Sequence, residues 1–139
     1  MSSSFSVFMN FDGNCKEAVK FYADVFGTIP GKTMTYSEMP GDSQYMKSEY
    51  ADKIMYTDLQ IAGTTVMFSD VPWDTKHTAG TNIVMSPGST DEDEVRRWFN
   101  GLQAGGQVIM PLGETFFSKL YGMVIDKYGI CWNVTCSGE

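Results

Sequence analysis

The sequence predicts an α+β fold in which the order strand, helix, strand, strand, strand occurs twice. Two amphipathic segments with helical spacing carry this prediction, since each follows one apolar strand and precedes three others. The two segments also match in detail. Asn14 precedes the aromatic pair Phe21-Tyr22 by seven and eight residues, and Asp91 precedes the pair Trp98-Phe99 by the same distances. We therefore expect two paired βαβββ modules.

The first module is expected over residues 1–71 and begins with an apolar strand, Phe5–Phe11. Its helix follows the N-cap Asn14, and Glu17 stands three residues later, in capping-box spacing. The apolar stripe of this helix consists of Ala18, Phe21, Tyr22 and Val25. Gly27 ends the helix, because glycine readily adopts the left-handed conformation that follows a helix.

Three strands are expected after this helix, over Lys32–Glu38, Ile54–Ile61 and Thr64–Ser69. The pair Ala62-Gly63 between the last two strands indicates a two-residue hairpin turn. Residues 72–80, which include Trp73-Asp74, are polar and rich in turn-forming residues. We interpret them as the linker between the modules.

The second module is expected over residues 81–139, with a first strand over Thr81–Met85. Its helix starts near Ser89-Thr90, and Asp91–Glu94 place four carboxylates at the positive end of the helix dipole. We interpret this acidic run as a solvated helix start rather than a metal site. The apolar stripe consists of Val95, Trp98, Phe99 and Leu102, and Gly105-Gly106 end the helix. Strands follow over Gln107–Met110, Lys119–Asp126 and Ile130–Thr135, the last two joined by the turn Asp126–Gly129.

The composition excludes several classes of protein. With 42% hydrophobic and 19% charged residues, the chain is expected to fold rather than to remain disordered. The formal net charge of −7 argues against a nucleic-acid partner, because phosphate binding requires clustered Lys and Arg. No apolar run reaches the roughly 18 residues of a membrane span, and the N-terminus lacks the pattern of a secretory signal. Three cysteines leave one unpaired in any disulfide scheme, which favours a cytoplasmic location.

An ordered series of short motifs runs through the whole chain. It comprises Phe11–Ala18, Phe21-Tyr22, Phe26-Gly27, Ile54-Met55, Leu59–Asp70, Gly105-Gly106, Pro111-Leu112, Tyr121-Gly122, Asp126–Gly129 and Trp132. With this series the chain resembles the vicinal oxygen chelate superfamily, also called the glyoxalase or bleomycin-resistance fold. It is most similar to the PhnB-like branch, often labelled 3-demethylubiquinone 3-methyltransferase-like. The resemblance implies mixed, curved sheets that enclose a cleft, and a homodimer.

The resemblance also points to positions where metal-dependent relatives carry His, Gln and Glu ligands. These positions fall near Val7, near Thr81 or Asn82, and at Asn133, and many branch members have His at the position of Tyr56. Asn and Thr are poor ligands for a divalent transition metal compared with imidazole and carboxylate. A divalent metal stays possible, but we expect no metal and no other cofactor.

Alternation along the strands selects the candidate ligand site. Tyr56 and Asp58 share one face of their strand, and Leu59 and Ile61 share the other, which should meet the helix. The candidate ligand-binding residues are Tyr56, Asp58, Ser69, Glu114, Phe117, Tyr121, Asn133 and Thr135. The alternative is that these polar groups form a solvated or interfacial sheet face. Ten methionines either add an adaptable pocket wall or fill the core.

The remaining reactive side chains predict no catalytic centre. His77 is the only histidine, so no cluster of His ligands is possible, and we expect it on a surface loop. Cys131 and Cys136 are expected to be buried, and Cys15 to be a helix-start residue rather than a nucleophile. The sequence identifies no catalytic residue.

The sequence therefore predicts a cytoplasmic homodimer that binds a small, partly apolar molecule in the cleft between its sheets. The competing class is a lyase, isomerase or dioxygenase in which a divalent metal polarises vicinal oxygens of a substrate. A third class is a structural module with a large apolar dimer face. Methyltransferase activity is not expected, because Gly105-Gly106 follow a helix, whereas a doubly wound methyl-donor site needs a glycine-rich turn that opens one.

Overall fold

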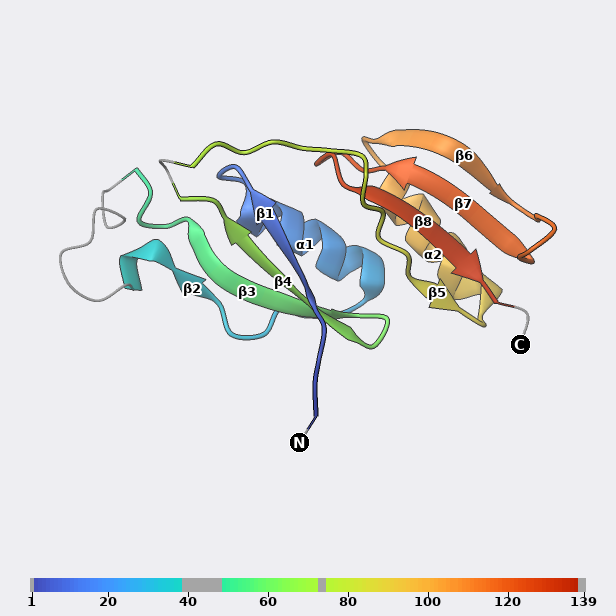
Figure 1. The fold of residues 1–139 in the computed structure, drawn as a ribbon, viewed down its shortest axis with the longest axis horizontal. Coiled ribbons are helices and arrows are strands. Elements are labelled where there is room, and N and C mark those ends of the chain that lie inside the picture. Colours follow the sequence, from blue (N-terminus) through green and yellow to red (C-terminus); the bar gives the residue numbers. More distant parts are fainter. Residues whose placement is uncertain (1, 39–48, 73–74, 138–139) are drawn as a thin grey trace. The chain divides into compact units, whose positions relative to one another are not determined.

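Two four-stranded sheets, each with one helix against it, build the protein (Figure 1). The structure, a computed structural model, describes residues 2–38, 49–72 and 75–137; Trp73-Asp74 of the expected linker lie outside them. The chain divides into two compact units, Met1–Ala23 with Gly27–His77 and Asp24–Phe26 with Thr78–Glu139. Neither helix in the described part of the chain is long and apolar enough to cross a membrane.

The first unit confirms the predicted order of elements. It contains strand β1 (Val7–Phe11), most of helix α1 (Cys15–Phe26), strand β2 (Met34–Thr35), the 3₁₀ helix η1 (Tyr36–Glu38), strand β3 (Ile54–Ile61) and strand β4 (Thr64–Asp70). The strand order across the sheet is β1-β4-β3-β2. Strand β1 pairs with β4 in parallel and the other pairs are antiparallel, so the sheet is mixed.

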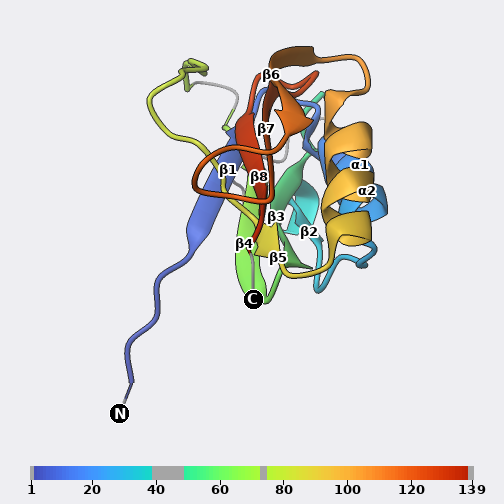
Figure 2. The ribbon, with the colours of Figure 1, turned by 90° about the vertical axis from the view of Figure 1, so that its right-hand side faces the viewer.

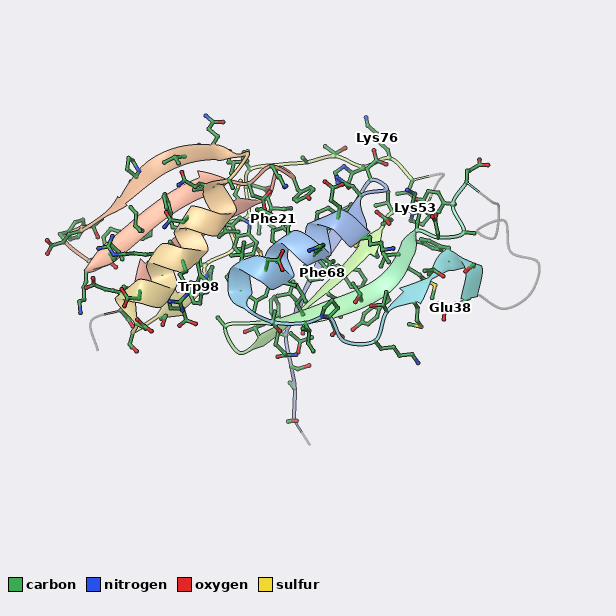
Figure 3. All side chains as sticks on the ribbon, turned by 180° about the vertical axis from the view of Figure 1, so that it is seen from behind. Phe21, Glu38, Lys53, Phe68, Lys76 and Trp98 are labelled. Carbon is green, nitrogen blue, oxygen red and sulfur yellow. The ribbon has the colours of Figure 1, made fainter. Side chains whose placement is uncertain are left out.

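Helix α1 covers one face of the first sheet because its apolar stripe and alternate strand residues meet there. Tyr22 stacks on Phe68 of β4, with ring centroids 5.9 Å apart, and both side chains are fully buried. Figure 3 shows Phe68 beside α1. Phe11 of β1 joins the same cluster. At the β3–β4 turn, Ala62 and Gly63 both have positive φ, as the predicted two-residue hairpin requires.

The second unit repeats the order. It contains strand β5 (Gly88–Ser89), helix α2 (Glu92–Gln103), and strands β6 (Gln107–Gly113), β7 (Leu120–Ile125) and β8 (Cys131–Cys136). The strand order is β5-β8-β7-β6, and Figure 2 shows α2 along one side of this sheet. The predicted apolar stripe of α2 is confirmed, since Val95, Trp98, Phe99 and Leu102 are buried. Phe26, in the last turn of α1, also belongs to this core, 5.4 Å from the rings of Trp98 and Trp132.

The strand expected over Thr81–Met85 is wrong. In this segment only Met85 pairs, through an isolated parallel bridge to Trp132, and the edge strand is Gly88–Ser89. Ile83 is largely exposed, so the apolar character of the segment does not reflect a place in the sheet. The apolar residues at the end of this segment indicated a strand, but the parallel pairing with β8 determines which residues form one.

The side-chain cap expected from Asn14 is also wrong. Asn14 occupies the N-cap position of α1 but makes no capping hydrogen bond with its side chain. The amide of Cys15 instead donates to Oδ1 of Asp70, at the end of β4, over 2.9 Å. A buried carboxylate satisfies this buried amide better than a short local side chain, because charge-assisted hydrogen bonds are stronger. The predicted helix end at Gly27 is confirmed, with φ of 66°.

Candidate functional site

The face of the first sheet opposite α1 carries a mixture of ring, thioether and polar side chains. Met9 and Phe11 are buried towards the helix, so Phe8 and Asn10 point to the other face. The register places Phe8 beside Met67 and Met67 beside Asp58, in one row across three strands. Phe8 is 47% exposed. We call this side of the sheet, defined by Phe8, Asn10, Tyr56, Asp58, Met67 and Ser69, the first open face.

Tyr56 and Asp58 interact directly on the first open face. The Tyr56 hydroxyl donates to Oδ2 of Asp58 over 2.8 Å. This hydrogen bond, followed by desolvation and by the charge of Asp58, raises the pKa of Tyr56 above its ordinary value of 10.0. The ring of Tyr56 also meets that of Phe8 edge-on, with centroids 6.2 Å apart. The Tyr56 hydroxyl therefore donates to a carboxylate that lies near two aromatic rings.

Gly31 lies next to Asp58. Its amide donates to the backbone carbonyl of Asp58 over 3.0 Å. A Cβ atom added to Gly31 would collide with Oδ1 of Asp58, so only glycine allows this placement of the carboxylate. The Asp58 side chain thus accepts from the Tyr56 hydroxyl and occupies space that a side chain at position 31 would fill.

Ser69 lies on the first open face but interacts mainly with β1. Its hydroxyl donates to Oδ1 of Asn10 over 3.0 Å. His77 reaches the same residue, since its Nε2 lies 3.2 Å from the Asn10 carbonyl oxygen. His77 lies in a loop, as expected from the sequence, and is half-buried beside the end of β1.

The second sheet also has a face opposite its helix, and four of the predicted residues belong to it or border it. Tyr121 stands opposite Thr135 in the β7–β8 pairing, and Asn133 stands opposite Met123. Phe117 meets Tyr121 edge-on, with ring centroids 5.1 Å apart, and is 60% exposed. We call Phe117, Tyr121, Met123, Asn133 and Thr135 the second open face.

The predicted residue Glu114 does not join the second open face, and neither does the aromatic residue Tyr128. Glu114 is exposed just after β6, and within the described residues it makes no hydrogen bond or ion pair with the other candidates. Tyr128 lies in the β7–β8 turn, at the opposite end of the hairpin from Tyr121. The aromatic side of the second open face therefore consists of Phe117 and Tyr121, with Phe116 fully exposed beside Phe117.

The side chains present do not fit a divalent metal. Among residues 2–38, 49–72 and 75–137, no group of three or more His, Cys, Asp or Glu side chains could hold an ion. Val7 and Asn133, which the resemblance in the sequence suggested as ligand positions, offer neither an imidazole nor a carboxylate. Asp58 offers one carboxylate, and the Tyr56 hydroxyl already bonds it.

The cysteines offer no nucleophile at either open face. All three are free and buried. Burial, and then the charge of Asp70, raises the pKa of the Cys15 thiol well above its ordinary value. A raised pKa leaves little thiolate at neutral pH, which disfavours Cys15 as a nucleophile.

Three residues of the first open face escaped the sequence reasoning. Alternation in β1 could have identified Phe8 and Asn10, because their neighbours Met9 and Phe11 are the core residues. Met67 could have been found in the same way from β4. No sequence signal points to Gly31, because its contact with Asp58 depends on the path of the chain before β2.

Comparison with known proteins gives a consistent result. A sequence model of the family described as 3-demethylubiquinone-9 3-methyltransferase matches residues 3–135. Protein YjdN of Escherichia coli (strain K12) is 29% identical, and the match covers 93% of this chain and 92% of YjdN. Protein PA1353 of Pseudomonas aeruginosa has 29% identity, a TM-score of 0.86, and coverage of 98% of both chains. The putative 3-demethylubiquinone-9 3-methyltransferase, PhnB protein, of Bacillus cereus has 26% identity, a TM-score of 0.76, and coverage of 96% of this chain and 98% of its own.

A more distant structure shows the fold class. The glyoxylase/bleomycin resistance protein/dioxygenase domain from Frankia sp. EAN1pec has a TM-score of 0.66 over 99% of this chain and 98% of its own. Its identity of 11% makes this a likeness of fold alone. Together with the two mixed four-stranded sheets, it confirms the predicted glyoxalase/bleomycin-resistance fold.

Proposed function

The chain belongs to the 3-demethylubiquinone-9 3-methyltransferase family, the PhnB-like branch of the glyoxalase superfamily, and we propose that it binds a small, partly apolar molecule without a catalytic metal. The observation that carries this proposal is the first open face. There the hydrogen-bonded pair Tyr56–Asp58 lies beside the partly exposed ring of Phe8. Small-molecule sites combine apolar walls with a few fixed polar groups, and this face has both.

The second open face supports the same proposal with different chemistry. Tyr121 and Phe117 provide an aromatic wall, and Asn133 and Thr135 provide neutral hydrogen-bonding groups on the neighbouring strand. A ligand with ring or alkyl surface and one or two polar groups suits such a face. The cleft expected between the sheets stays a prediction.

The methyltransferase named in the family description receives no support from the sheets. Methyl-donor sites of the doubly wound type lie at the carboxyl ends of parallel strands, beside a glycine-rich turn. Here each sheet contains one parallel pair, β1 with β4 or β5 with β8, and the remaining pairs are antiparallel. We therefore propose binding rather than methyl transfer.

The metal-assisted lyase, isomerase or dioxygenase is the competing proposal. It requires imidazole or carboxylate ligands around an open coordination position. The residues at the family's ligand positions favour the metal-free alternative. Metal analysis of protein purified without chelator decides between the two, since stoichiometric Zn, Ni, Mn or Fe would contradict metal-free binding.

A fragment screen tests the binding proposal directly. We expect fragments with one ring and one polar group to shift the amide resonances of Phe8, Tyr56 and Asp58 in ¹⁵N-labelled protein. Tyr56→Ala should lower the affinity for these fragments about tenfold, because a contact worth roughly 1.4 kcal/mol is lost. Gln60→Ala, two positions beyond Asp58 on the same strand, is the matched control and should leave affinity within about twofold. Fragments that shift only helix residues would contradict the proposal.

The oligomeric state and the cellular location are also proposals. We propose a cytoplasmic homodimer, with strand β6 as a candidate contact. This strand is at the edge of its sheet, and its residues Val108, Ile109 and Met110 are exposed. An exposed apolar edge favours pairing with another chain, and a second copy would cover it.

A further inference from the structure

The Asp58 carboxylate has an unusual set of neighbours for a surface acid. Within the described residues no Lys or Arg forms an ion pair with it, and its side-chain partner is the neutral Tyr56 hydroxyl. A carboxylate has about four lone-pair positions, and Tyr56 occupies one of them. The group is therefore held in place while most of its capacity to accept hydrogen bonds is unused.

Aromatic and thioether side chains share the first open face with this carboxylate. Tyr56 lies beside Asp58 through the hydrogen bond, and Phe8 meets the Tyr56 ring at 66°. Met67 stands between Phe8 and Asp58 in the strand register. Ring faces attract cations within about 6 Å of the ring centroid, and thioethers are soft and adaptable. We call Phe8, Tyr56, Asp58 and Met67 the Asp58 corner.

We propose that the Asp58 corner binds a small organic cation, a substituted ammonium group whose charge faces Asp58 and whose alkyl groups contact Phe8, Tyr56 and Met67. This inference rests on the proposed function and adds that the ligand carries a positive charge. The chain carries a formal net charge of −7, so its field attracts cations and repels anions. An inorganic divalent ion fits less well, because it requires several hard oxygen ligands and gains nothing from rings.

The role of Gly31 sharpens the inference. Because a Cβ at this position would collide with Oδ1 of Asp58, Gly31→Ala should turn the carboxylate away while leaving its charge on the protein. Binding that depends on general electrostatic attraction would survive this change. Binding that depends on the position of the carboxylate would not.

The test compares a cation with its neutral isostere. Choline and 3,3-dimethylbutan-1-ol have nearly the same shape and differ in the charge, and each is titrated into ¹⁵N-labelled protein. We expect choline to shift Phe8, Tyr56 and Asp58 and to bind about tenfold more tightly than the alcohol, as one charged contact of roughly 1.4 kcal/mol would give. Asp58→Asn should remove that difference, and Gly31→Ala should reduce it by more than half.

Asp52→Asn is the matched control. Asp52 is exposed and lies outside the Asp58 corner, so this variant changes the net charge by the same amount and should bind choline as the unmodified protein does. Tighter choline binding that survives in Asp58→Asn would overturn the inference. So would equal binding of the two compounds, or an absence of choline shifts.

The outcomes also separate this inference from the proposed function. If neutral fragments shift Phe8 and Tyr56 while choline does not, the cation is wrong and small-molecule binding at this face stands. If neither choline nor any fragment shifts these residues, both the inference and the proposed function fail. Circular dichroism of each variant confirms that a loss of binding does not come from unfolding.

Discussion

The first amides of helix α1 and helix α2 donate to different kinds of acceptor, although each helix follows one strand and precedes three. The amide at the start of α1 donates to Asp70, which is 55 residues away in the sequence and 1% exposed. At the start of α2, Asp91 accepts from the amide of Asp93 two residues later, in solvent. The start of the first helix is therefore tied to the inner strand β4 of its own sheet, and the second helix is capped locally.

Asp70, the acceptor at the start of α1, also joins three segments of the first unit. Asp70 Oδ2 accepts from the amide of Ile54 at the start of β3, and the Asp70 carbonyl accepts from the Tyr36 hydroxyl over 2.7 Å. Lys53 adds a bond from its ammonium group to the Gly13 carbonyl, next to the helix start (Figure 3). The difference teaches that equivalent helix starts can be fixed by a distant buried acid in one unit and by a local cap in the other.

The largest expected effect comes from removing that acid. Asp70→Ala leaves the buried amides of Cys15 and Ile54 without a charged acceptor, so we expect a loss of about 3 kcal/mol or more in the free energy of unfolding. Asp91→Ala removes one exposed cap and should cost about 1 kcal/mol. Urea unfolding of both variants measures the difference.

Asp70→Asn keeps the prediction testable if the alanine variant does not fold. Its amide group can still accept from Cys15 but would point a donor at the Ile54 amide, so its cost should fall between those of the other two variants. Equal losses for Asp70→Ala and Asp91→Ala would show that the two helix starts are equivalent after all.

Two closely packed glycines give the next comparison. A Cβ at Gly122 would lie 2.6 Å from Cε1 of Phe99, in the core of the second unit, so Gly122→Ala should cost about 1–3 kcal/mol. At Gly31 the Cβ meets the Asp58 side chain on the first open face, which can turn into solvent, so Gly31→Ala should cost less than about 1 kcal/mol. Thermal unfolding of the two variants checks the order, and a larger loss for Gly31→Ala would contradict it.

The sequence predicts a structural feature well where the feature depends on the side-chain pattern within one strand or helix. Apolar alternation locates Ile54–Ile61, which forms β3 with Leu59 and Ile61 buried. The same alternation brings Tyr56 and Asp58 to one face, since residues two apart in a strand are neighbours. Two positions of the predicted ligand site were therefore accessible from the sequence.

Features that depend on distant backbone were not accessible. The edge strand at Gly88–Ser89 exists because β8 offers it parallel partners, and nothing in Thr81–Met85 reveals that its pairing is limited to Met85. The cap of α1 comes from Asp70, whereas local pattern favours Asn14. Tertiary hydrogen bonds of this kind override local preference, because a buried amide must find an acceptor wherever the fold provides one.

The smallest effect concerns the titration of Tyr56 on the first open face. Its pKa is raised because the protonated hydroxyl donates to Asp58, so the folded state favours the neutral phenol. The stabilisation from this hydrogen bond is complete below the ordinary pKa of 10.0 and is lost as the pH rises through the higher folded value. We expect Asp58→Asn to return the pKa of Tyr56 towards its ordinary value, because both the charge and the strong acceptor are gone. The ¹³Cζ resonance of Tyr56, followed between about pH 8 and pH 12, measures this change, and Asp52→Asn should leave the curve in place. An unchanged curve in Asp58→Asn would mean that Tyr56 does not donate to Asp58 in solution. The first open face would then lack the fixed carboxylate that distinguishes it from the second open face.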